Sequence, residues 1–574
     1  MDTLGINAAY HDPAACLVRD GRVIAAAEDE RFTHVKHGKR PVPFAAWELP
    51  FHAIDYCLGI AGIDLADVDH VAYSYDPYLL LGRHRDADSI PIPLQKIAPA
   101  PEWESPWAPL FLSSIVNAPG QLLDGAPHHL EARFRNARDH ARFRWHFVAH
   151  HLAHAASAFH ASPLEKAAVM TLDGRGERAT TGYAVGQGIA LEWLGQVHMP
   201  HSLGILYEQV TSYLGFLHSS DEYKVMALAS FGKPRYVSEF TSMIHLGPEG
   251  KYTIDPPRLE ERFGPARLRG GPLEARHFDI AHSLQVVLED TVIELARWLR
   301  GASGCRDLCM AGGVALNCVM NARLRDRGPF ESIWVQPAAG DAGTALGAAL
   351  WVDARERPGA GRDWAMDHAF LGPEYGEAEI DAFLKWSRLP YRRMENVPEE
   401  AAAILAQDRV VGWFQGRMEF GPRALGARSI LASPLHAEMQ ARLNEIKDRE
   451  DFRPVAPVVL EEEAAEWFEG AQVSPFMLFV FDVKADKADR IPAVRHTDGT
   501  SRIQTIRRDQ NPIYYDLIRA FQRRTGVPVL VNTSFNTRGE PIVCTPRDAV
   551  ESFWTSPLDA LVIGPFLLEK SGGG

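Results

Sequence analysis

Two histidines four residues apart, His150 and His154, have a spacing suited to metal ligands. Four residues make about one helical turn, so on a helix the two imidazoles share a face, with Cβ atoms roughly 6 Å apart. An apolar run, residues 167–172, ends farther along at Asp173 and would deliver a carboxylate. Two imidazoles and one carboxylate form a known ligand set with open positions for substrate. The alternative is a chance cluster in a chain that carries 23 histidines.

Apolar runs near the start of the sequence predict three short strands. His11 and Asp12 lie between the first two runs, where an actin-like nucleotide-binding domain places its first phosphate-facing turn. A solvated turn is the other interpretation. The predicted strands are residues 4–9, 14–19 and 22–27, and Asp20-Gly21 between the last two is a hairpin signal.

Two later strands each end in a glycine-bearing turn that opens a helix. At such a turn backbone N–H groups approach a phosphate, and the helix N-terminus adds a favourable partial charge. The pair of turns, together with the strand end at Asp173-Gly174, favours a nucleotide cleft, although either turn alone could serve tight packing. The turns contain Gly312, Gly313 and Asn317 after strand 308–311, and Gly340, Asp341 and Thr344 after strand 333–336. Asp341 is placed to be a further metal or magnesium ligand.

Cationic side chains gather in the second half of this acidic chain. Guanidinium groups fork onto phosphate or carboxylate oxygens, and a strand over residues 529–531 leads into Asn532 and Ser534, which offer donors at a turn. The segment predicts a second anion site, although acids such as Glu450 and Asp451 could pair with some of the cations. The cations are Arg417, Arg423, Arg428, Lys447, Arg449 and Arg453.

Composition limits the class of protein. The chain has 574 residues, more than one hydrophobic core usually serves, so two or three domains are expected. The net charge of −14 argues against a nucleic-acid partner. Six cysteines without a C-x-x-C pair favour a reduced, cytoplasmic environment. We expect no membrane partner, because the chain shows no secretion signal and no apolar run of roughly 18–20 residues.

Segments of unusual composition suggest an insertion and a linker. Pro and Trp recur within residues 76–145, above all over 90–115, which would be an insertion that covers a cleft or an irregular surface loop. Residues 354–370 have the composition of a linker. Helices are expected at residues 51–61, 280–299, 377–386 and 399–407, and Ser202 is expected to cap another.

Nine ordered motifs resemble those of a known family. They are similar to motifs of the O-carbamoyltransferases of the nodulation-protein-U and cephem-carbamoyltransferase family, which includes the aminoglycoside carbamoyltransferase of nebramycin biosynthesis. The matches run from about residue 4 to residue 568. The motifs are GINAAYHDPAACLVRDG, HHLAHAASAF, VMTLDGRGE, EYKVMALASFG, MAGGVALN, GDAGTALGAAL, GRMEFGPRALGARSIL, DFRPVAP and VNTSFNTRGEPIV.

The resemblance implies an α/β protein with two working parts. Residues 1–353, with the insertion at about 76–145, would form an actin-like (ASKHA, Kae-type) domain similar to the universal tRNA threonylcarbamoyladenosine synthase subunit. A linker, 354–390, would join it to an α+β, YrdC-like domain of residues 391–574. In the family, the C-terminal domain takes carbamoyl phosphate and liberates a carbamate-level species. The N-terminal domain couples that species to ATP, giving carbamoyl adenylate and pyrophosphate, and passes the carbamoyl group to an alcohol.

The resemblance also implies roles for single residues. Iron(II) would be bound by His150, His154, Asp173 and Asp341, whereas His151 does not fit the four-residue step; Mg²⁺ could accompany ATP. His11 is the candidate base, since neutral imidazole titrates near working pH, and Lys224 is a second catalytic candidate. The residues expected to bind the nucleotide are Asp12, Gly174, Gly312, Gly313, Asn317, Gly340 and Thr344. Those expected to bind carbamoyl phosphate are Arg423, Lys447, Arg449, Arg453, Asn532 and Ser534.

Two other functions are alternatives at this point. A tRNA threonylcarbamoyl-transfer role is disfavoured by the fused second domain, the negative net charge and the resemblance to small-molecule enzymes. A non-enzymatic ATP- and metal-binding module would require the arginine cluster to be only structural. The expected acceptor is a small-molecule alcohol, as in the tailoring of a natural product or antibiotic, and its identity is not predicted. A homodimer is compatible with the sequence.

Overall fold

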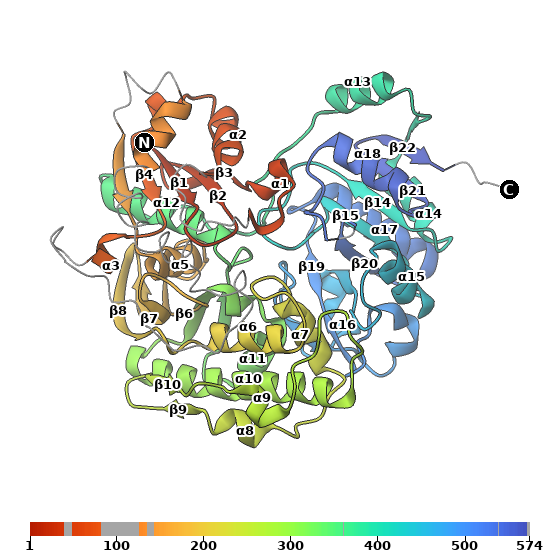
Figure 1. Ribbon diagram of the computed structural model, residues 1–574. Helices are drawn as coiled ribbons and strands as arrows, with labels where there is room; N and C mark the ends of the chain where they lie inside the picture. The colour runs from red at the N-terminus through yellow and green to blue at the C-terminus, as the bar shows by residue number, and fades with distance from the viewer. Residues whose placement is uncertain (39–48, 82–125, 135–142, 360, 538, 571–574) are drawn as a thin grey trace.

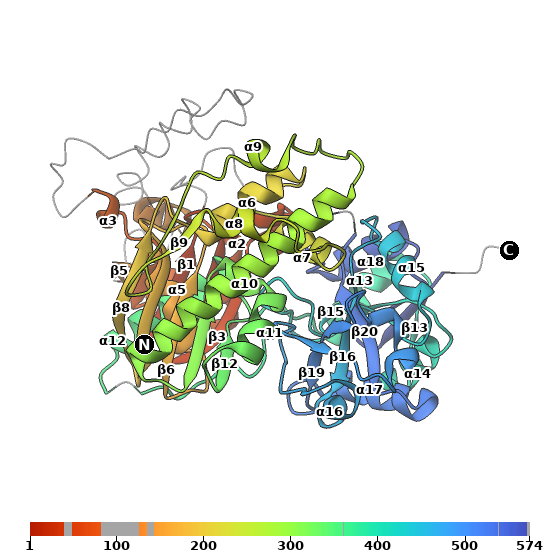
Figure 2. The ribbon, with the colours of Figure 1, turned by 90° about the horizontal axis from the view of Figure 1, so that it is seen from below.

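The computed structural model describes residues 1–574 except 39–48, 82–125, 135–142, 360, 538 and 571–574 (Figure 1). The Pro/Trp-rich stretch 90–115 lies outside the described residues, as does most of the predicted insertion at 76–145. The described chain forms two parts that lie side by side, an N-terminal part built on two main sheets and a C-terminal part built on one large mixed sheet (Figures 1 and 2).

The first sheet contains the predicted hairpin. Its strands are β1 (Asp2–Asn7), β2 (Ala14–Arg19), β3 (Arg22–Glu28), β4 (His70–Tyr73) and β5 (Arg144–Phe147), in the order β3-β2-β1-β4-β5. β2 and β3 join through Asp20 and Gly21, whose φ angles are 49° and 79°. Positive φ at both positions is what a type I′ hairpin turn requires, so the hairpin is confirmed. β2 pairs antiparallel to β1, whereas β4 pairs parallel to β1 and β5 parallel to β4.

The second sheet repeats the first. Its strands are β6 (Lys166–Leu172), β7 (Ala179–Gln187), β8 (Ala190–His198), β11 (Asp307–Ala311) and β12 (Ser332–Val335), in the order β12-β11-β6-β7-β8. Here β6 takes the central place of β1. On one side β7 pairs antiparallel to β6 and β8 antiparallel to β7, and on the other β11 pairs parallel to β6 and β12 parallel to β11. A duplicated sheet of this order confirms the predicted actin-like α/β architecture of the N-terminal part.

Two helices lie back to back between these sheets, α5 (His150–Phe159) and α12 (Ala342–Glu356). Each packs against the sheet that it does not follow: α5 comes after β5 but packs on β6 and β11, and α12 comes after β12 but packs on β1 and β2. The approach is close enough to demand glycine. A Cβ on Gly347 would lie 1.8 Å from the carbonyl oxygen of Ala153. A Cβ on Gly5 would lie 1.9 Å from the carbonyl oxygen of Ala345.

The long helix α10 (Ala275–Ser303) runs along the outer face of the N-terminal part (Figure 2). It packs against α6 (Leu203–Tyr213) and α7 (Glu222–Ala229). The predicted cap is present, because Ser202 Oγ accepts the backbone N–H of Ile205 at 3.1 Å. The other elements of this part are α1 (Glu30–Thr33), α2 (Phe51–Ala61), α3 (Tyr78–Leu81), α8 (Val237–Thr241), α9 (Leu259–Phe263), α11 (Cys318–Arg327), β9 (Ile244–Leu246) and β10 (Tyr252–Ile254).

The C-terminal part is α+β, as predicted, with helices covering a mixed eight-stranded sheet in the order β13-β22-β21-β14-β15-β20-β16-β19. The strands are β13 (Arg392–Arg393), β14 (Val411–Phe414), β15 (Arg428–Ala432), β16 (Ala456–Leu460), β19 (Gln504–Ile506), β20 (Val529–Ser534), β21 (Ala560–Ile563) and β22 (Phe566–Glu569), with β17 (Val480–Asp482) and β18 (Thr500–Arg502) paired apart. The helices are α13 (Glu377–Ser387), α14 (Val397–Leu405), α15 (Glu438–Ile446), α16 (Ala464–Trp467), α17 (Pro512–Thr525) and α18 (Pro546–Thr555). Within the described residues, no helix is long and apolar enough to cross a membrane.

Buried polar contacts join the two parts. Arg31 of α1 donates to the carbonyl oxygen of Gly421 at 3.0 Å, and Glu28 of β3 accepts the N–H of the same glycine at 3.0 Å. Arg417 donates to the carbonyl oxygens of Ile24 and Leu371 at 3.0 and 2.7 Å. These contacts use backbone groups on both sides of the junction, so they fix the position of one part relative to the other.

Candidate metal centre and anion site

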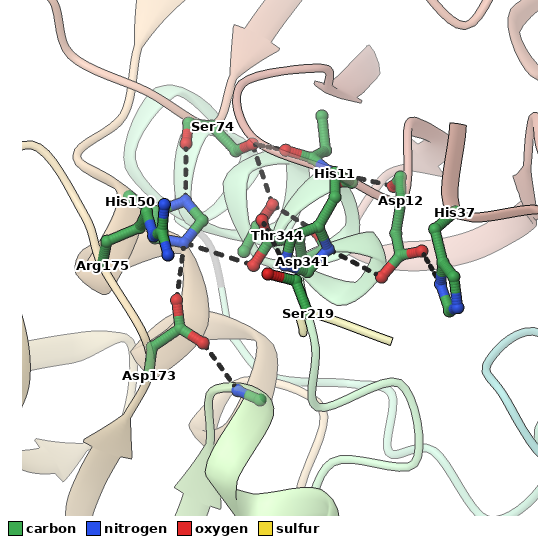
Figure 3. A network of polar contacts seen from close by, with 12 residues as sticks. His11, Asp12, His37, Ser74, His150, Asp173, Arg175, Ser219, Asp341 and Thr344 are labelled. Carbon is green, nitrogen blue, oxygen red and sulfur yellow. Dashed lines mark hydrogen bonds and ion pairs between the residues drawn. The ribbon is translucent and has the colours of Figure 1, made fainter. Parts of the chain in front are cut away.

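Four buried side chains converge beside the N-terminal ends of α5 and α12. Their ligand atoms all lie within 4.8 Å of one another, and the four residues are His150, His154, Asp173 and Asp341. Figure 3 shows three of these side chains, those of His150, Asp173 and Asp341. The Nε2 atoms of the two histidines are 3.1 Å apart. His150 Nε2 lies 3.3 Å from an Asp173 oxygen and 3.5 Å from an Asp341 oxygen, and the matching distances for His154 are 3.8 and 3.7 Å. The structure therefore brings together all four residues predicted as metal ligands, here called the His–Asp cluster.

The repeated topology explains why these residues meet. His150 is the first residue of α5, which follows β5, and Asp341 directly precedes α12, which follows β12. The two residues therefore occupy nearly equivalent positions after the two sheets. Asp173 directly follows the central strand β6, just as the turn with His11 and Asp12 follows the central strand β1. Because α5 and α12 lie back to back, the first turns of both helices and the turns that follow β1 and β6 come together in one place.

Neighbouring groups orient the ligand atoms. The Nδ1 atom of His150 lies 3.4 Å from the carbonyl oxygen of Ser74. A carbonyl partner accepts a hydrogen bond from Nδ1, so Nε2 is the His150 nitrogen that is directed into the cluster. The buried carboxylate of Glu177 accepts the backbone N–H of His150 at 2.9 Å, and Asp173 uses its second oxygen to accept the N–H of Gly313 at 2.8 Å.

The polar atoms of the His–Asp cluster fit a divalent metal. Both carboxylate oxygens of Asp341 are buried and accept no hydrogen bond from the described residues. Burial opposes ionisation of both acids, but His11 and His150 keep the pKa of Asp341 below its usual value, and His150 and His154 keep the pKa of Asp173 well below it. Buried carboxylates that stay charged require a nearby cation. Two imidazoles and two carboxylates are ligands for transition metals such as iron, manganese or zinc.

His11 lies next to the His–Asp cluster. Its Nε2 atom is 3.8 Å from Asp341 and its Nδ1 atom is 2.9 Å from Asp12. Burial opposes the charged imidazole, but the carboxylates of Asp341 and Asp12 raise the pKa of His11 to about 10. A protonated imidazole donates a proton, so the predicted role as base requires a cation at Asp341 to offset this field. Asp12 also contacts Nδ1 of His37 at 2.9 Å.

The glycine turn after β11 has two different roles. Gly312 has a φ of 95°, and a Cβ there would lie 2.1 Å from the carbonyl oxygen of Leu172. This glycine is needed for close packing, the alternative that the sequence left open. Gly313 instead orients a ligand through its N–H bond to Asp173.

The other residues predicted to bind the nucleotide differ in position. Gly174 and Gly340 adjoin the ligands in sequence, and Thr344 Oγ1 donates to Ser74 Oγ at 2.8 Å. Asn317 lies elsewhere: it caps α11, where its Oδ1 accepts a backbone N–H at 2.9 Å, and its amide donates to Gln285 at 2.8 Å. These contacts occupy the Asn317 side chain outside the His–Asp cluster.

Lys224 lies in the first turn of α7, at the junction with the C-terminal part. Its Nζ atom donates to Glu450 at 2.9 Å and lies 3.3 Å from Asp221. These partners place Lys224 beside the C-terminal cations rather than beside the His–Asp cluster. A catalytic role for it stays a prediction.

Five cationic side chains, here called the cationic cluster, gather in the C-terminal part: Arg423, Lys447, Arg449, Arg453 and Arg502. Within the described chain, Nε of Arg423, Nη2 of Arg449 and Nε of Arg502 are buried and have no hydrogen-bond partner. Burial and the nearby Arg502 lower the pKa of Arg423 to about 9, and burial and Arg453 do the same for Arg449. An anion would relieve this repulsion between buried like charges.

Lys447, the one lysine of the cationic cluster, is almost fully buried. Its Nζ atom donates to the carbonyl oxygen of Ser534 at 2.5 Å and to Oδ1 of Asn536 at 2.7 Å. Burial and the neighbouring arginines lower the pKa of Lys447 well below its usual value. The Asn532 amide donates to Gln504 at 2.8 Å, whereas its Oδ1 atom has no partner among the described residues.

Some predicted cations are structural, and some site residues were not predicted. Arg417 and Arg428 donate to backbone carbonyl oxygens, so neither belongs to the cationic cluster. Arg502 was missed because it lies well beyond the arginine-rich segment in sequence. His37, Ser74 and Glu177 were missed because their contacts with the site residues follow no characteristic spacing in the sequence.

The chain belongs to the carbamoyltransferase family. A family model described as the carbamoyltransferase N-terminus matches residues 2–350, and one described as the carbamoyltransferase C-terminus matches residues 402–570. These matches confirm the family that the sequence motifs indicated. The protein is therefore a transferase of carbamoyl groups.

Several relatives are similar over nearly the whole chain. An uncharacterised protein of Synechocystis is 41% identical over 617 residues, covering 99% of this chain and 96% of its own. The nodulation protein NolNO of Sinorhizobium fredii is 40% identical over 583 residues, covering 98% of this chain and 80% of its own. Among solved structures, full-length HypF in a phosphate- and nucleotide-bound form is 13% identical over 63% of this chain and 56% of its own, with a TM-score of 0.35.

Proposed function

We propose that the enzyme uses carbamoyl phosphate and ATP to form carbamoyl adenylate, and then transfers the carbamoyl group to a hydroxyl of a small molecule. Carbamoyl phosphate would first lose phosphate to water and yield carbamate. Carbamate would then attack the α-phosphate of ATP and release pyrophosphate. In the last step the acceptor alcohol would attack the carbamoyl carbon and release AMP.

The unpaired guanidinium nitrogens of the cationic cluster carry this proposal. Arg423, Arg449 and Arg502 keep buried N–H groups without partners in the described protein, which favours a ligand with several anionic oxygens. Carbamoyl phosphate has such oxygens and is small enough to be enclosed. We assign Arg423, Lys447, Arg449, Arg453, Asn532 and Ser534 to its site, together with Arg502.

The His–Asp cluster supports a nucleotide site in the N-terminal part. His150, His154, Asp173 and Asp341 would hold the metal, which we propose to be Fe²⁺, and the bound metal would supply positive charge for phosphate oxygens. Mg²⁺ would accompany ATP. Carbamoyl adenylate is a mixed anhydride with a good leaving group, so the protein mainly has to position it and exclude water. We assign to His11 the exchange of a proton with the acceptor hydroxyl, and the turns at Gly174, Gly313 and Gly340 would face the nucleotide.

The remaining assignments follow from the same proposal. We place the metal and nucleotide chemistry in residues 1–353 and the carbamoyl phosphate chemistry in residues 391–574, a division supported by the two family matches at 2–350 and 402–570. We propose a natural-product alcohol as acceptor, with no nucleic-acid or membrane partner. A cytoplasmic location is supported by the six cysteines, all of which are buried and free.

Pyrophosphate release from ATP tests the proposed reaction. We expect release to require carbamoyl phosphate, and Arg453→Ala to raise the KM for carbamoyl phosphate at least about tenfold, since a charged contact to the ligand is lost. Arg508→Ala, which removes an exposed arginine paired with Asp516, is the control and should leave that KM unchanged. Release of phosphate from ATP regardless of carbamoyl phosphate, or no turnover of ATP at all, would contradict the proposal.

A further inference from the structure

Helix α7 of the N-terminal part reaches the cationic cluster of the C-terminal part. Val225 and Leu228 are fully buried in the N-terminal core and anchor the helix there. Tyr223 and Lys224, in its first turn, instead contact the loop that follows α15 in the C-terminal part, through Glu450 and Arg453. The anion site is therefore bordered by side chains from both parts.

Glu450 contacts two cations, Lys224 of the N-terminal part and Arg453 of the C-terminal part. One carboxylate oxygen accepts a hydrogen bond from Lys224 Nζ at 2.9 Å, and the other lies 3.5 Å from Arg453 Nη1. Burial opposes both charges, but the hydrogen bond between them raises the pKa of Lys224 and lowers the pKa of Glu450. Both groups are therefore charged, and Lys224 is the closer partner of the carboxylate.

This arrangement determines how far the guanidinium donors of Arg453 are available to a bound anion. A carboxylate paired tightly with Arg453 would compete with any anion for its donors. At 3.5 Å the contact between Glu450 and Arg453 is at the limit of a hydrogen bond, so the guanidinium is only weakly engaged.

Tyr223 supplies the second contact to Arg453. The guanidinium carbon lies 4.7 Å from the centroid of the Tyr223 ring. Stacking of this kind restricts a planar guanidinium to a few orientations. The Tyr223 phenol also acts electrostatically on the pKa values of Arg423 and Arg449, so the ring lies at the edge of the cationic cluster.

We propose that Lys224 and Tyr223 are positioning residues for the anion site: Lys224 holds the Glu450 carboxylate off Arg453, and Tyr223 holds the Arg453 guanidinium toward the ligand. The inference rests on the proposed function, in which carbamoyl phosphate is the anion. Its consequence is that the N-terminal part completes the carbamoyl phosphate site, so the site is fully formed only when the two parts are docked.

Steady-state pyrophosphate release by the full-length enzyme, with carbamoyl phosphate varied at saturating ATP, tests the role of Lys224. We expect Lys224→Met to raise the KM for carbamoyl phosphate about tenfold with little change in kcat, because Glu450 then turns to Arg453. In the double variant Lys224→Met/Glu450→Gln, KM should return to within about threefold of the wild-type value, since the competing carboxylate is gone. Lys487→Met, which removes a similarly covered lysine from its pair with Glu466, should change neither parameter.

The alternative outcomes are distinct. A fall in kcat that Glu450→Gln does not restore would mean that Lys224 acts on the reacting atoms, and would overturn the proposal. An unchanged KM in Lys224→Met would also overturn it. If Arg453→Ala too left KM unchanged, the carbamoyl phosphate site itself would be wrongly assigned.

The same assay tests Tyr223. Tyr223→Phe should preserve the KM for carbamoyl phosphate because it keeps the ring, whereas Tyr223→Leu should raise that KM about threefold or more.

Discussion

Adjacent histidines of α5 have different surroundings, which determine which of them can bind a metal. His150 directs Nε2 into the His–Asp cluster, whereas the Nδ1 atom of His151 lies 2.8 Å from Thr171 Oγ1 on β6. Burial, followed by the imidazoles of His150 and His154, lowers the pKa of His151 to about 3. His151 is therefore a neutral, packed side chain beside the centre.

Substitution of these two histidines tests the ligand assignment. We expect His150→Ala to lose bound metal and activity, because one of four ligands disappears. His151→Gln, which keeps a polar group of similar length near Thr171, should bind metal with the wild-type stoichiometry. The measurement is metal content after anaerobic reconstitution with Fe²⁺, alongside thermal unfolding. Equal metal loss in both variants would contradict the assignment, and His151→Ala is unsuitable because it would leave a cavity.

Much of the His–Asp cluster could be predicted from local spacing. The i, i+4 pair and a carboxylate at the end of a buried strand identified His150, His154 and Asp173, and the turn before a small-residue helix identified Asp341. The groups that orient these ligands could not be predicted. Ser74 meets His150 through its backbone carbonyl oxygen, and Glu177 accepts the backbone N–H of His150, so neither role depends on a recognisable pattern.

At the scale of elements, the packing of α5 against α12 sets the distance between the histidines and Asp341. The strands and the main helices were predictable from apolar periodicity and capping residues. The exchange by which each helix packs on the other sheet was not, because it depends on contacts distant in sequence. The sequence feature connected with this packing is the run of small residues around Gly347. Such a run is equally compatible with any buried helix, so it does not indicate the sheet on which the helix packs.

Gly347→Ala tests this coupling between packing and metal binding. A Cβ would meet the Ala153 carbonyl oxygen at 1.8 Å, so α12 must move away from α5. We expect a loss of stability of about 1–3 kcal/mol from overpacking and weaker metal binding. Gly301→Ala in α10 is the matched control: nothing lies within 4 Å of the added Cβ, and it should stabilise by about 0.5–1 kcal/mol without changing metal affinity. Thermal unfolding and metal titration measure both, and wild-type metal affinity in Gly347→Ala would refute the coupling.

On the scale of the whole molecule, the junction does more than connect two parts. Arg31, Glu28 and Gly421 form a buried contact between β3, α1 and the C-terminal part, and the pair of Lys224 and Glu450 forms a second contact nearer the cationic cluster. If carbamate passes from one site to the other, both contacts bear on the same step. Sequence motifs assigned each part a function, but they carried no information about which residues would meet across the junction.

The titration of Glu28 gives the junction a measurable pH dependence. Burial raises the pKa of Glu28 from 4.5 to about 7, although Arg31 opposes the shift. Because the folded-state pKa lies above that of the unfolded chain, the stability from protonated Glu28 is complete below about pH 4.5 and is lost as the pH rises to about 7. The glutamine in Glu28→Gln stays neutral at every pH, so this variant cannot lose that stability. Its unfolding free energy relative to wild type should therefore increase between pH 4.5 and 7, by at most about 1.4 kcal/mol per pH unit, and then level off. Urea unfolding of both proteins at pH 5, 6, 7 and 8 would measure this difference, and parallel curves would show that Glu28 is ionised throughout the range and that Arg31 outweighs its burial.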